Sequence, residues 1–227
     1  MNKNRCSAEI KSKALSQGAT AAGIASVKAV LKTPSHRKDA KVHRRFKDGV
    51  FLVLTLEHTP DNPSLDWWGG RGGTAGNREL LRICRLLQNW IKKTGSIHSR
   101  ILSYHVEKEG IYLKEAAVAA GLGCIGRNNL LITPQHGANV RLKAMLLESD
   151  LAVDGPAEFD PCEHCPAPCL TACPQNAFQS GAYDRKACAI QMRKDEANRQ
   201  PVLHGGEQNA IVSYCRACEW ACPNPMP

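Results

Sequence analysis

The sequence predicts an α+β fold, with a mixed α/β domain over residues 1–150 followed by a cysteine-rich domain over residues 151–227. Helical and strand patterns alternate as far as Ser149, whereas proline and cysteine dominate after Asp150. The hydrophobic content of 43% is ordinary for a chain with a packed core. A length of 227 residues allows one large domain or two small ones.

The first elements alternate between helix and strand. Residues 7–17 read as a helix that Ser7 caps and Gly18 ends. A short strand of small residues is expected at 20–25, and the apolar run VFLVLTL at 50–56 predicts a buried strand. The loop that follows is long and rich in glycine, which is typical of functional or disordered segments. Its Trp67 and Trp68 could form a lid with stacking faces, or could equally pack on their own domain.

The strongest helical pattern covers residues 77–93. Apolar residues recur there at steps of three and four, so they share one face; these are Leu80, Ile83, Cys84, Leu87, Trp90 and Ile91. A strand is expected at 101–106, and a helix at 113–120 that Gly121 closes. Two more strands, at 130–133 and 140–147, flank a PQHG turn.

Charge and targeting signals narrow the class of protein. The formal charge is +9, which favours an acidic partner protein, a phosphate-bearing cofactor or RNA without selecting one. The N-terminal residues lack an apolar targeting segment, and no run approaches the roughly 18 apolar residues of a membrane span. We therefore expect a soluble, cytoplasmic protein with no membrane partner.

The eleven cysteines are unevenly distributed. Cys6, Cys84 and Cys124 stand alone, while eight lie between Cys162 and Cys222. In a reducing compartment such a concentration of thiols indicates metal ligands and not disulfides. Cys6 and Cys84 are expected to be small buried hydrophobes.

Two motifs contain seven of these eight cysteines. The first is Cys162-x2-Cys165-x3-Cys169-x3-Cys173-Pro, the second is Cys215-x2-Cys218-x3-Cys222-Pro, and Cys188 lies between them. Bacterial two-cluster ferredoxins carry a similar C-x2-C-x2-C-x3-C-P run, in which the fourth cysteine binds the other cluster. The extra residue between Cys165 and Cys169, and the distance from Cys188 to Cys215, depart from that pattern.

The ferredoxin rule divides the eight thiols into two sets of four. Cys162, Cys165, Cys169 and Cys222 would hold one [4Fe–4S] cluster, and Cys173, Cys188, Cys215 and Cys218 the other. Two such clusters would lower the net charge from +9 to about +5. The alternative is a zinc module that includes His164. His136 and His204 are expected to be turn or surface residues.

The segment KEAAVAAGLGCIGRNNLLITPQHGANVRLKAMLLESDL, together with the two Cys-Pro motifs, resembles the epoxyqueuosine reductase and reductive dehalogenase superfamily. The N-terminal GATAAGIAS is similar to the opening strand of those proteins. The resemblance implies a nitroreductase-like α/β domain that binds cobalamin and a ferredoxin-like domain whose two clusters supply its electrons. It would place Gly121, Gly123, Gly126, Arg127 and Asn128 against the corrin. The alternative is that GLGCIG is only a helix C-cap and a tight turn.

Three departures distinguish the chain from a typical epoxyqueuosine reductase. Glu107 stands where the family has an aspartate proton donor, Cys124 replaces a tryptophan, and the sequence stops five residues after Cys222. Glu107, beside Lys108 and Glu109, could act as an acid or could simply be solvated.

The function predicted first is a cobalamin-dependent reductase, hence an oxidoreductase. The second candidate is an electron-transfer protein that reduces a partner, such as a corrinoid protein that it activates, and the third is a tRNA-modifying reductase. The expected partners are a low-potential donor such as a ferredoxin or flavodoxin and a corrinoid protein or small-molecule substrate, with nucleic acid less favoured.

Overall fold

The computed structural model describes residues 3–57, 68–69, 75–94, 97–204 and 207–224. Its contacts divide the chain into two compact units that interleave along the sequence. Unit 1 comprises residues 1–56, 80–124 and 140–159, and unit 2 comprises residues 57–79, 125–139 and 160–227. The predicted domains of residues 1–150 and 151–227 remain a prediction, as does their assignment as nitroreductase-like and ferredoxin-like. The structure shows a chain of mixed α and β elements.

Unit 1 is built on a four-stranded sheet of order β1-β2-β7-β4. The strands are β1 (Ala21–Ser26), β2 (Val50–Glu57), β7 (Val140–Glu148) and β4 (His98–Ile101). β1 pairs antiparallel with β2, and β4 with β7. Seven consecutive residues of β2 are buried, so both faces of this strand are covered. Three of the predicted strands of unit 1 are therefore present, but the strand predicted at 101–106 is wrong: strand β4 ends at Ile101.

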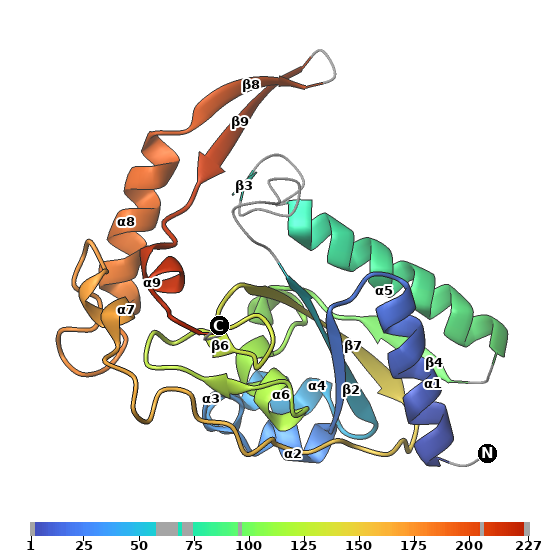
Figure 1. The fold of residues 1–227 in the computed structure, drawn as a ribbon. Helices are drawn as coiled ribbons and strands as arrows, with labels where there is room; N and C mark the ends of the chain where they lie inside the picture. Colours follow the sequence, from blue (N-terminus) through green and yellow to red (C-terminus); the bar gives the residue numbers. More distant parts are fainter. Residues whose placement is uncertain (1–2, 58–67, 70–74, 95–96, 205–206, 225–227) are drawn as a thin grey trace. The chain divides into compact units, whose positions relative to one another are not determined.

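Helices cover this sheet (Figure 1). They are α1 (Lys3–Ser16), α2 (Val27–Leu31), α3 (Pro34–Arg37), α4 (Ala40–Arg45), α5 (Ala75–Thr94) and α6 (Leu113–Ala119), with a 3₁₀ turn, η2, at Val106–Lys108. α1, α2 and α6 pack against β1, and α6 also packs against β7. The predicted face of α5 is confirmed, since Leu80, Ile83 and Leu87 are fully buried. Cys6 and Cys84 are buried as expected.

Strand β1 and helix α6 approach each other closely at Gly23. A Cβ atom at this position would lie 2.2 Å from the carbonyl oxygen of Ala120, so only glycine fits without movement of the backbone. α6 then ends in a Schellman motif, in which the amide of Leu122 donates to the carbonyl of Ala117 and Gly121 adopts φ +73°.

Unit 2 contains shorter elements. β3 (Trp68–Gly69), β9 (Glu207–Ser213) and β8 (Gln200–His204) form a sheet in that order, and β5 (Cys124–Ile125) pairs with β6 (Leu131–Ile132). The helices are α7 (Pro168–Thr171), α8 (Arg185–Ala197) and α9 (Ala217–Trp220). Trp67 lies outside the described residues, and for Trp68 only the backbone pairing with β9 is described, so the suggested lid stays untested.

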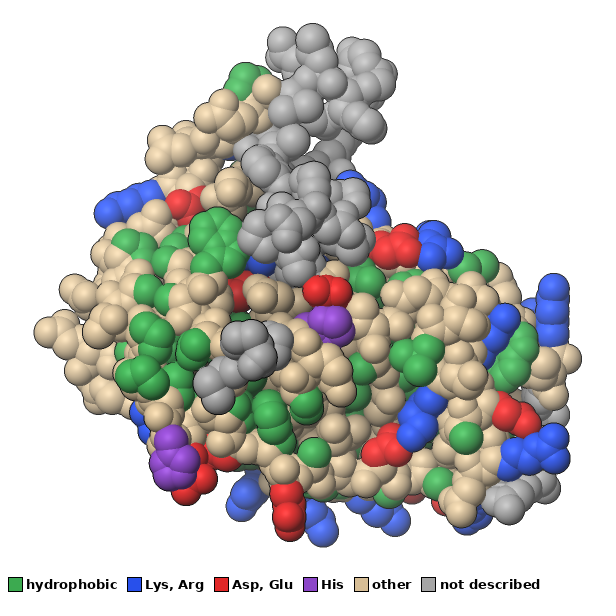
Figure 2. Space-filling model, viewed as in Figure 1, with side chains coloured by type: hydrophobic (Ala, Val, Ile, Leu, Met, Phe, Trp, Pro, Cys, Tyr) green, Lys and Arg blue, Asp and Glu red, His purple; other side chains and the backbone are tan. Residues whose placement is uncertain are grey.

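Charged side chains of both signs are interspersed on the face in Figure 2. Within the described residues, no helix combines the length and apolar character that a bilayer crossing requires.

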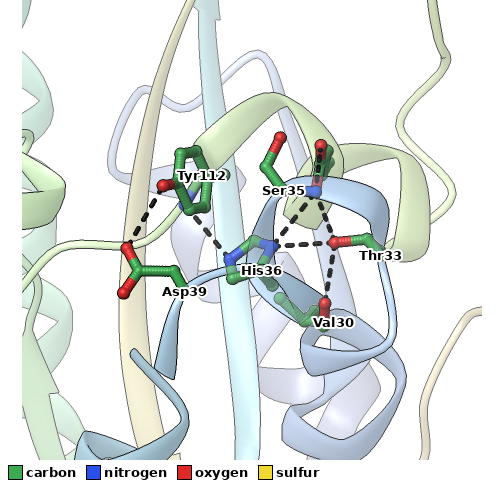
Figure 3. A network of polar contacts seen from close by, with 7 residues as sticks. Val30, Thr33, Ser35, His36, Asp39 and Tyr112 are labelled. Atoms are coloured by element: carbon green, nitrogen blue, oxygen red, sulfur yellow. Dashed lines mark hydrogen bonds and ion pairs between the residues drawn. The ribbon is translucent and has the colours of Figure 1, made fainter. Parts of the chain in front are cut away.

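A buried polar network joins α6 to the α3–α4 segment within unit 1 (Figure 3). His36 is fully buried, and its Nε2 accepts a hydrogen bond from the backbone amide of Tyr112 at 3.1 Å. Nε2 therefore carries no proton, and the neutral ring bears its proton on Nδ1, which lies 3.2 Å from a carboxylate oxygen of Glu115. The network thus holds a histidine in one neutral tautomer.

Acid is expected to destabilise the protein through His36. Burial lowers the pKa of His36 from 6.5, with Glu115 opposing the shift. The unfolded chain then binds a proton that the folded chain resists, so stability is lost as pH falls below about 6.5. One such site contributes at most about 1.4 kcal/mol per pH unit. Urea unfolding at pH 7.5, 6.5 and 5.5 should show a shallower pH dependence for His36→Asn than for the wild type; equal slopes would exclude this residue as the cause.

Candidate metal centre

The eight clustered cysteines all belong to unit 2 and come from three helices and the loops that flank them. Cys169 lies in α7, Cys188 in α8 and Cys218 in α9, and α7 contacts α9. The other five lie in adjoining loops; they are Cys162, Cys165, Cys173, Cys215 and Cys222. All eleven cysteines of the chain are free of disulfides.

The first set of thiols gathers around Cys169. Burial raises the pKa of Cys169, and its electrostatic neighbours Cys222, Cys162 and Cys165 raise it further. Burial likewise raises the pKa of Cys222, the backbone amide of Asn224 lowers it, and Cys162 and Cys165 raise it again. Cys222, from the second motif, is therefore a neighbour of three cysteines from the first.

The second set gathers around Cys218. Burial raises its pKa to about 12, with further contributions from Cys215, Cys173 and Cys188. The pKa of Cys215 is also raised, first by burial, and its neighbours include Asp195, Cys173 and Cys188. Cys173, from the first motif, is therefore a neighbour of the later cysteines.

The electrostatic neighbours of Cys169 and Cys222, and those of Cys215 and Cys218, thus form two groups of four thiols. Their assignment as ligands of two clusters stays a prediction. In the part of the chain that the structure describes, no three His, Cys, Asp or Glu side chains come close enough to hold a single metal ion. The zinc module stays the alternative to two clusters. His164 is exposed, with 91% of its side-chain surface accessible.

The extra residue of the first motif is accommodated at Ala167. This residue adopts a left-handed conformation (φ 55°, ψ 51°) immediately before α7, which costs about 1–2 kcal/mol in a non-glycine residue. The amide of Ala167 is 3.4 Å from the sulfur of Cys165, and the amide of Ala177 is 3.4 Å from that of Cys173. Both amides point donors at sulfur, which stabilises a thiolate.

Cys188 is placed by a well-capped helix. Asp184 accepts hydrogen bonds from the amides of Lys186, at 2.7 Å, and Ala187, so α8 begins just before the cysteine. Burial raises the pKa of Tyr183, and a hydrogen bond with the Cys188 thiol raises it further. This helix bridges the long gap between Cys173 and Cys215.

Arg127 and Asn128 contact the cysteine loops directly. Arg127 donates to the carbonyl of Cys165 at 3.3 Å and to that of Glu163 at 3.5 Å. Asn128 is only 3% exposed; its Nδ2 donates to the carbonyl of Cys218 at 3.2 Å, and its Oδ1 accepts from the amide of Leu130 at 3.1 Å. The two residues thus join one short segment to both motifs, which the sequence did not reveal.

Contacts within the protein and backbone conformation require glycine at three positions of the same segment. A Cβ on Gly121 would lie 2.6 Å from the carbonyl of Gly155, and one on Gly126 would lie 2.7 Å from Ile132. Gly123 adopts φ 146°. The local geometry therefore contains the helix C-cap and turn of the alternative interpretation, and the contact of these residues with a corrin stays a prediction.

Three other candidate residues remain, namely Glu107, His136 and His204. The Glu107 side chain is 75% exposed and lies 3.6 Å from His105, which agrees with the solvated alternative. His136 lies in the predicted turn, 3.3 Å from Glu57. The His204 side chain lies outside the described residues.

We expect Asn128→Leu to lower both stability and cluster retention. The change leaves the Cys218 carbonyl and the Leu130 amide without their partner in a part-buried place, at a cost of about 1 kcal/mol each. Urea unfolding and iron retention after gel filtration would measure the effect. Gln135→Leu makes a comparable change at an exposed residue and should leave both quantities unchanged; equal losses in the two variants would contradict the assigned role of Asn128.

The fold and the two sets of thiols define a class of protein in which a mixed α/β unit accompanies a cysteine-rich unit. Solved structures share this fold. An epoxyqueuosine reductase from Bacillus subtilis superimposes with a TM-score of 0.68 at 18% identity, over 98% of this chain and 66% of that one. A catabolic reductive dehalogenase gives 0.62 at 17% identity, over 98% of this chain and 32% of that one. At these identities the likeness shows the fold alone.

Curated relatives carry the name epoxyqueuosine reductase. One from Synechococcus sp. is 31% identical over 171 residues, which are 74% of this chain and 50% of the relative. One from Cyclobacterium marinum is 28% identical over 133 residues, which are 58% and 42%. The chain thus spans about half the length of these relatives or less, and no model of a known protein family matches it. The relatives are oxidoreductases by name, which agrees with the predicted class, and together with the structures they support the resemblance to the superfamily.

Proposed function

We propose that the chain is an iron–sulfur oxidoreductase that holds two [4Fe–4S] clusters. Cys162, Cys165, Cys169 and Cys222 would bind one cluster, and Cys173, Cys188, Cys215 and Cys218 the other. The observation that carries the proposal is the grouping of the thiols, since each motif contributes one cysteine to the set of the other. Such crossed ligation is the arrangement of two-cluster ferredoxins.

The residues around the thiols suit this role. The amides of Ala167 and Ala177 donate toward sulfur, and Arg127 and Asn128 fix the loops through backbone carbonyls. These contacts leave lone pairs on the sulfur atoms for coordination of iron and limit movement of the loops. Restricted loops favour rapid electron transfer because little of the protein reorganises when the charge changes.

We further propose that the electrons reach a corrinoid, which makes the chain a cobalamin-dependent reductase. A bound corrinoid would supply a metal centre that reduces a small substrate. Support comes from the fold, which is shared with a reductive dehalogenase whose structure suggests a mechanism for B12-dependent dehalogenation, at a TM-score of 0.56 and 18% identity. The segment from Gly121 to Asn128 remains the proposed contact. Its glycines and the Asn128 side chain also make contacts within the chain itself.

A second candidate is electron transfer to a partner protein. Cys215 is an exposed residue overall, although its thiol is partly desolvated, and Trp220, two residues after Cys218, is 58% exposed. An accessible edge of a cluster is what a docking redox partner requires. A ferredoxin or flavodoxin would be a suitable donor in either case.

One titration separates the two candidates. The chain would be reconstituted anaerobically to about eight irons and titrated with cobalamin. Corrin absorption that co-elutes with intact clusters supports the reductase. Intact clusters without bound corrinoid would leave electron transfer to a partner, and fewer than about eight irons, or zinc in their place, would overturn the whole proposal.

Reduction of epoxyqueuosine is the activity named for the curated relatives, and one matching structure contains a tRNA stem loop. The net charge of +9 favours testing this activity as well. Binding of an RNA stem loop that weakens steeply with salt would support it, and absent or salt-insensitive binding would remove it.

A further inference from the structure

A chain of hydrogen bonds runs from the first cysteine motif to the second through α8. Gln175, two residues after Cys173, donates to Gln191 at 2.9 Å. Gln191 donates to Oδ1 of Asp195 at 2.8 Å. Oδ2 of Asp195 accepts a hydrogen bond from the backbone amide of Cys215, also at 2.8 Å. A carboxylate therefore ends the chain at the backbone of a proposed cluster ligand.

The position of Asp195 on α8 brings it close to a second proposed ligand. Cys188, Gln191 and Asp195 follow one another at steps of three and four, so they share one face of the helix. All three are half-buried, whereas most of α8 is exposed. Asp195 is also the first electrostatic neighbour that raises the pKa of Cys215. Its charge therefore acts on a thiol of the second set.

We propose that Asp195 is a positioning residue that lowers the reduction potential of the cluster held by Cys173, Cys188, Cys215 and Cys218. The proposal rests on the two-cluster function proposed above. A [4Fe–4S]²⁺ cluster that accepts one electron gains one negative charge, which a nearby carboxylate opposes. The carboxylate also occupies an amide that would otherwise be available to donate toward sulfur, and hydrogen bonds to sulfur are one of the factors that set the potential.

Within this chain of hydrogen bonds, Asp195 and Gln191 have opposite electrostatic effects on the proposed cluster. Asp195 carries the charge, while the Gln191 amide donates to that carboxylate and disperses it. Removal of the charge should therefore raise the potential, but removal of the Gln191 donor should not. A purely structural role would predict the same direction for both changes, because each change breaks the same chain.

The experiment is a redox titration of the anaerobically reconstituted full-length chain, followed by EPR, with iron content measured on every sample. In Asp195→Asn we expect one midpoint potential to become less negative while the other is unchanged. The expected size is about a tenfold rise in the reduced-to-oxidised ratio at a fixed potential, which is ~59 mV for one electron. Asp195→Glu keeps the charge and should stay near the wild-type potential. Gln191→Met should show no upward shift.

Glu196→Gln is the matched control. Glu196 is the next residue and loses the same charge, but its carboxylate accepts from the Tyr214 hydroxyl at 2.9 Å and not from a ligand backbone. A much smaller shift is expected. Equal shifts in Asp195→Asn and either Glu196→Gln or Gln191→Met would overturn the proposal, as would no shift in Asp195→Asn, or retention of only about four irons in that variant. A wild-type chain without two clusters would instead refute the function on which the proposal rests.

Discussion

Simultaneous replacement of Cys169 and Cys222 by alanine is expected to remove one cluster and to leave the other intact. Iron should fall from about eight to about four per chain. The reason is that Cys222 lies among the thiols of the first motif, beside Cys162 and Cys165. With two of four ligands absent, the first cluster has too few thiolates, whereas the second set keeps all four. Iron analysis and EPR of the reduced protein measure the outcome.

Cys169→Ala with Cys173→Ala provides the decisive comparison. These two cysteines are neighbours in the sequence and belong to one motif, yet Cys173 lies with Cys188, Cys215 and Cys218. The pair should therefore damage both clusters. If each motif instead held its own cluster, this second pair would leave one cluster intact and the first pair would damage both. Cys84→Ala, at a buried cysteine outside both sets, should retain all the iron.

The sequence predicts the fold best where burial is complete. The α5 face and strand β2 were predictable because their apolar residues are fully buried, so the hydrophobic pattern carries the full structural signal. The strand predicted at 101–106 was wrong because β4 pairs through His98–Ile101 at the end of β7. The residues of β4 are half-buried or exposed, and the partner strand β7 sets their register. The sequence of β4 therefore carries little hydrophobic alternation of its own.

Elements that depend on other parts of the chain were missed. Helix α8 has no fully buried residue among those described, so its sequence lacks a strong apolar stripe. The short helices α2, α3 and α4 are also absent from the prediction, although Ser26 and Asp39 cap two of them through side-chain hydrogen bonds. Those caps were the available signal.

The candidate site shows the same contrast. The sequence alone proposes the cysteines as ligands, because their spacing within each motif is itself the chemical signal. The roles of Arg127 and Asn128 were not, because their acceptors lie 38 and 90 residues further along the chain. Asp195 is similarly hidden, since its partner Cys215 is 20 residues away. Contacts of this kind appear only once the chain is folded.

Glu115→Ala is expected to lower the free energy of unfolding by about 3 kcal/mol. The Glu115 side chain is 13% exposed and accepts from the amide of Ser35 at 3.0 Å, from the Thr33 hydroxyl and from the His36 ring. Alanine would remove these charge-assisted hydrogen bonds and leave the part-buried Ser35 amide without its acceptor, whereas the Thr33 hydroxyl keeps the Val30 carbonyl and the His36 Nδ1 keeps the Thr33 oxygen. A hydrogen bond to a charged group contributes about 1.5–3 kcal/mol, in part recovered by relaxation. A domain is stable by only about 5–15 kcal/mol, so the loss is large.

Urea unfolding at pH 7.5, followed by circular dichroism, measures this loss. The Ser35, Thr33 and His36 contacts all lower the pKa of Glu115, against the effect of burial, so the carboxylate is fully charged at this pH. Its contribution should persist above about pH 4.5 and be lost as pH falls through the lowered value. Glu115→Gln keeps one acceptor and should cost less than Glu115→Ala. Glu107→Ala removes an exposed carboxylate and should cost under about 0.5 kcal/mol. Glu115 lies in the first turn of α6, the helix that leads into Gly121. If Glu115→Ala lowered the free energy of unfolding as little as Glu107→Ala, α6 would be held by its apolar contacts with β1 and β7 alone.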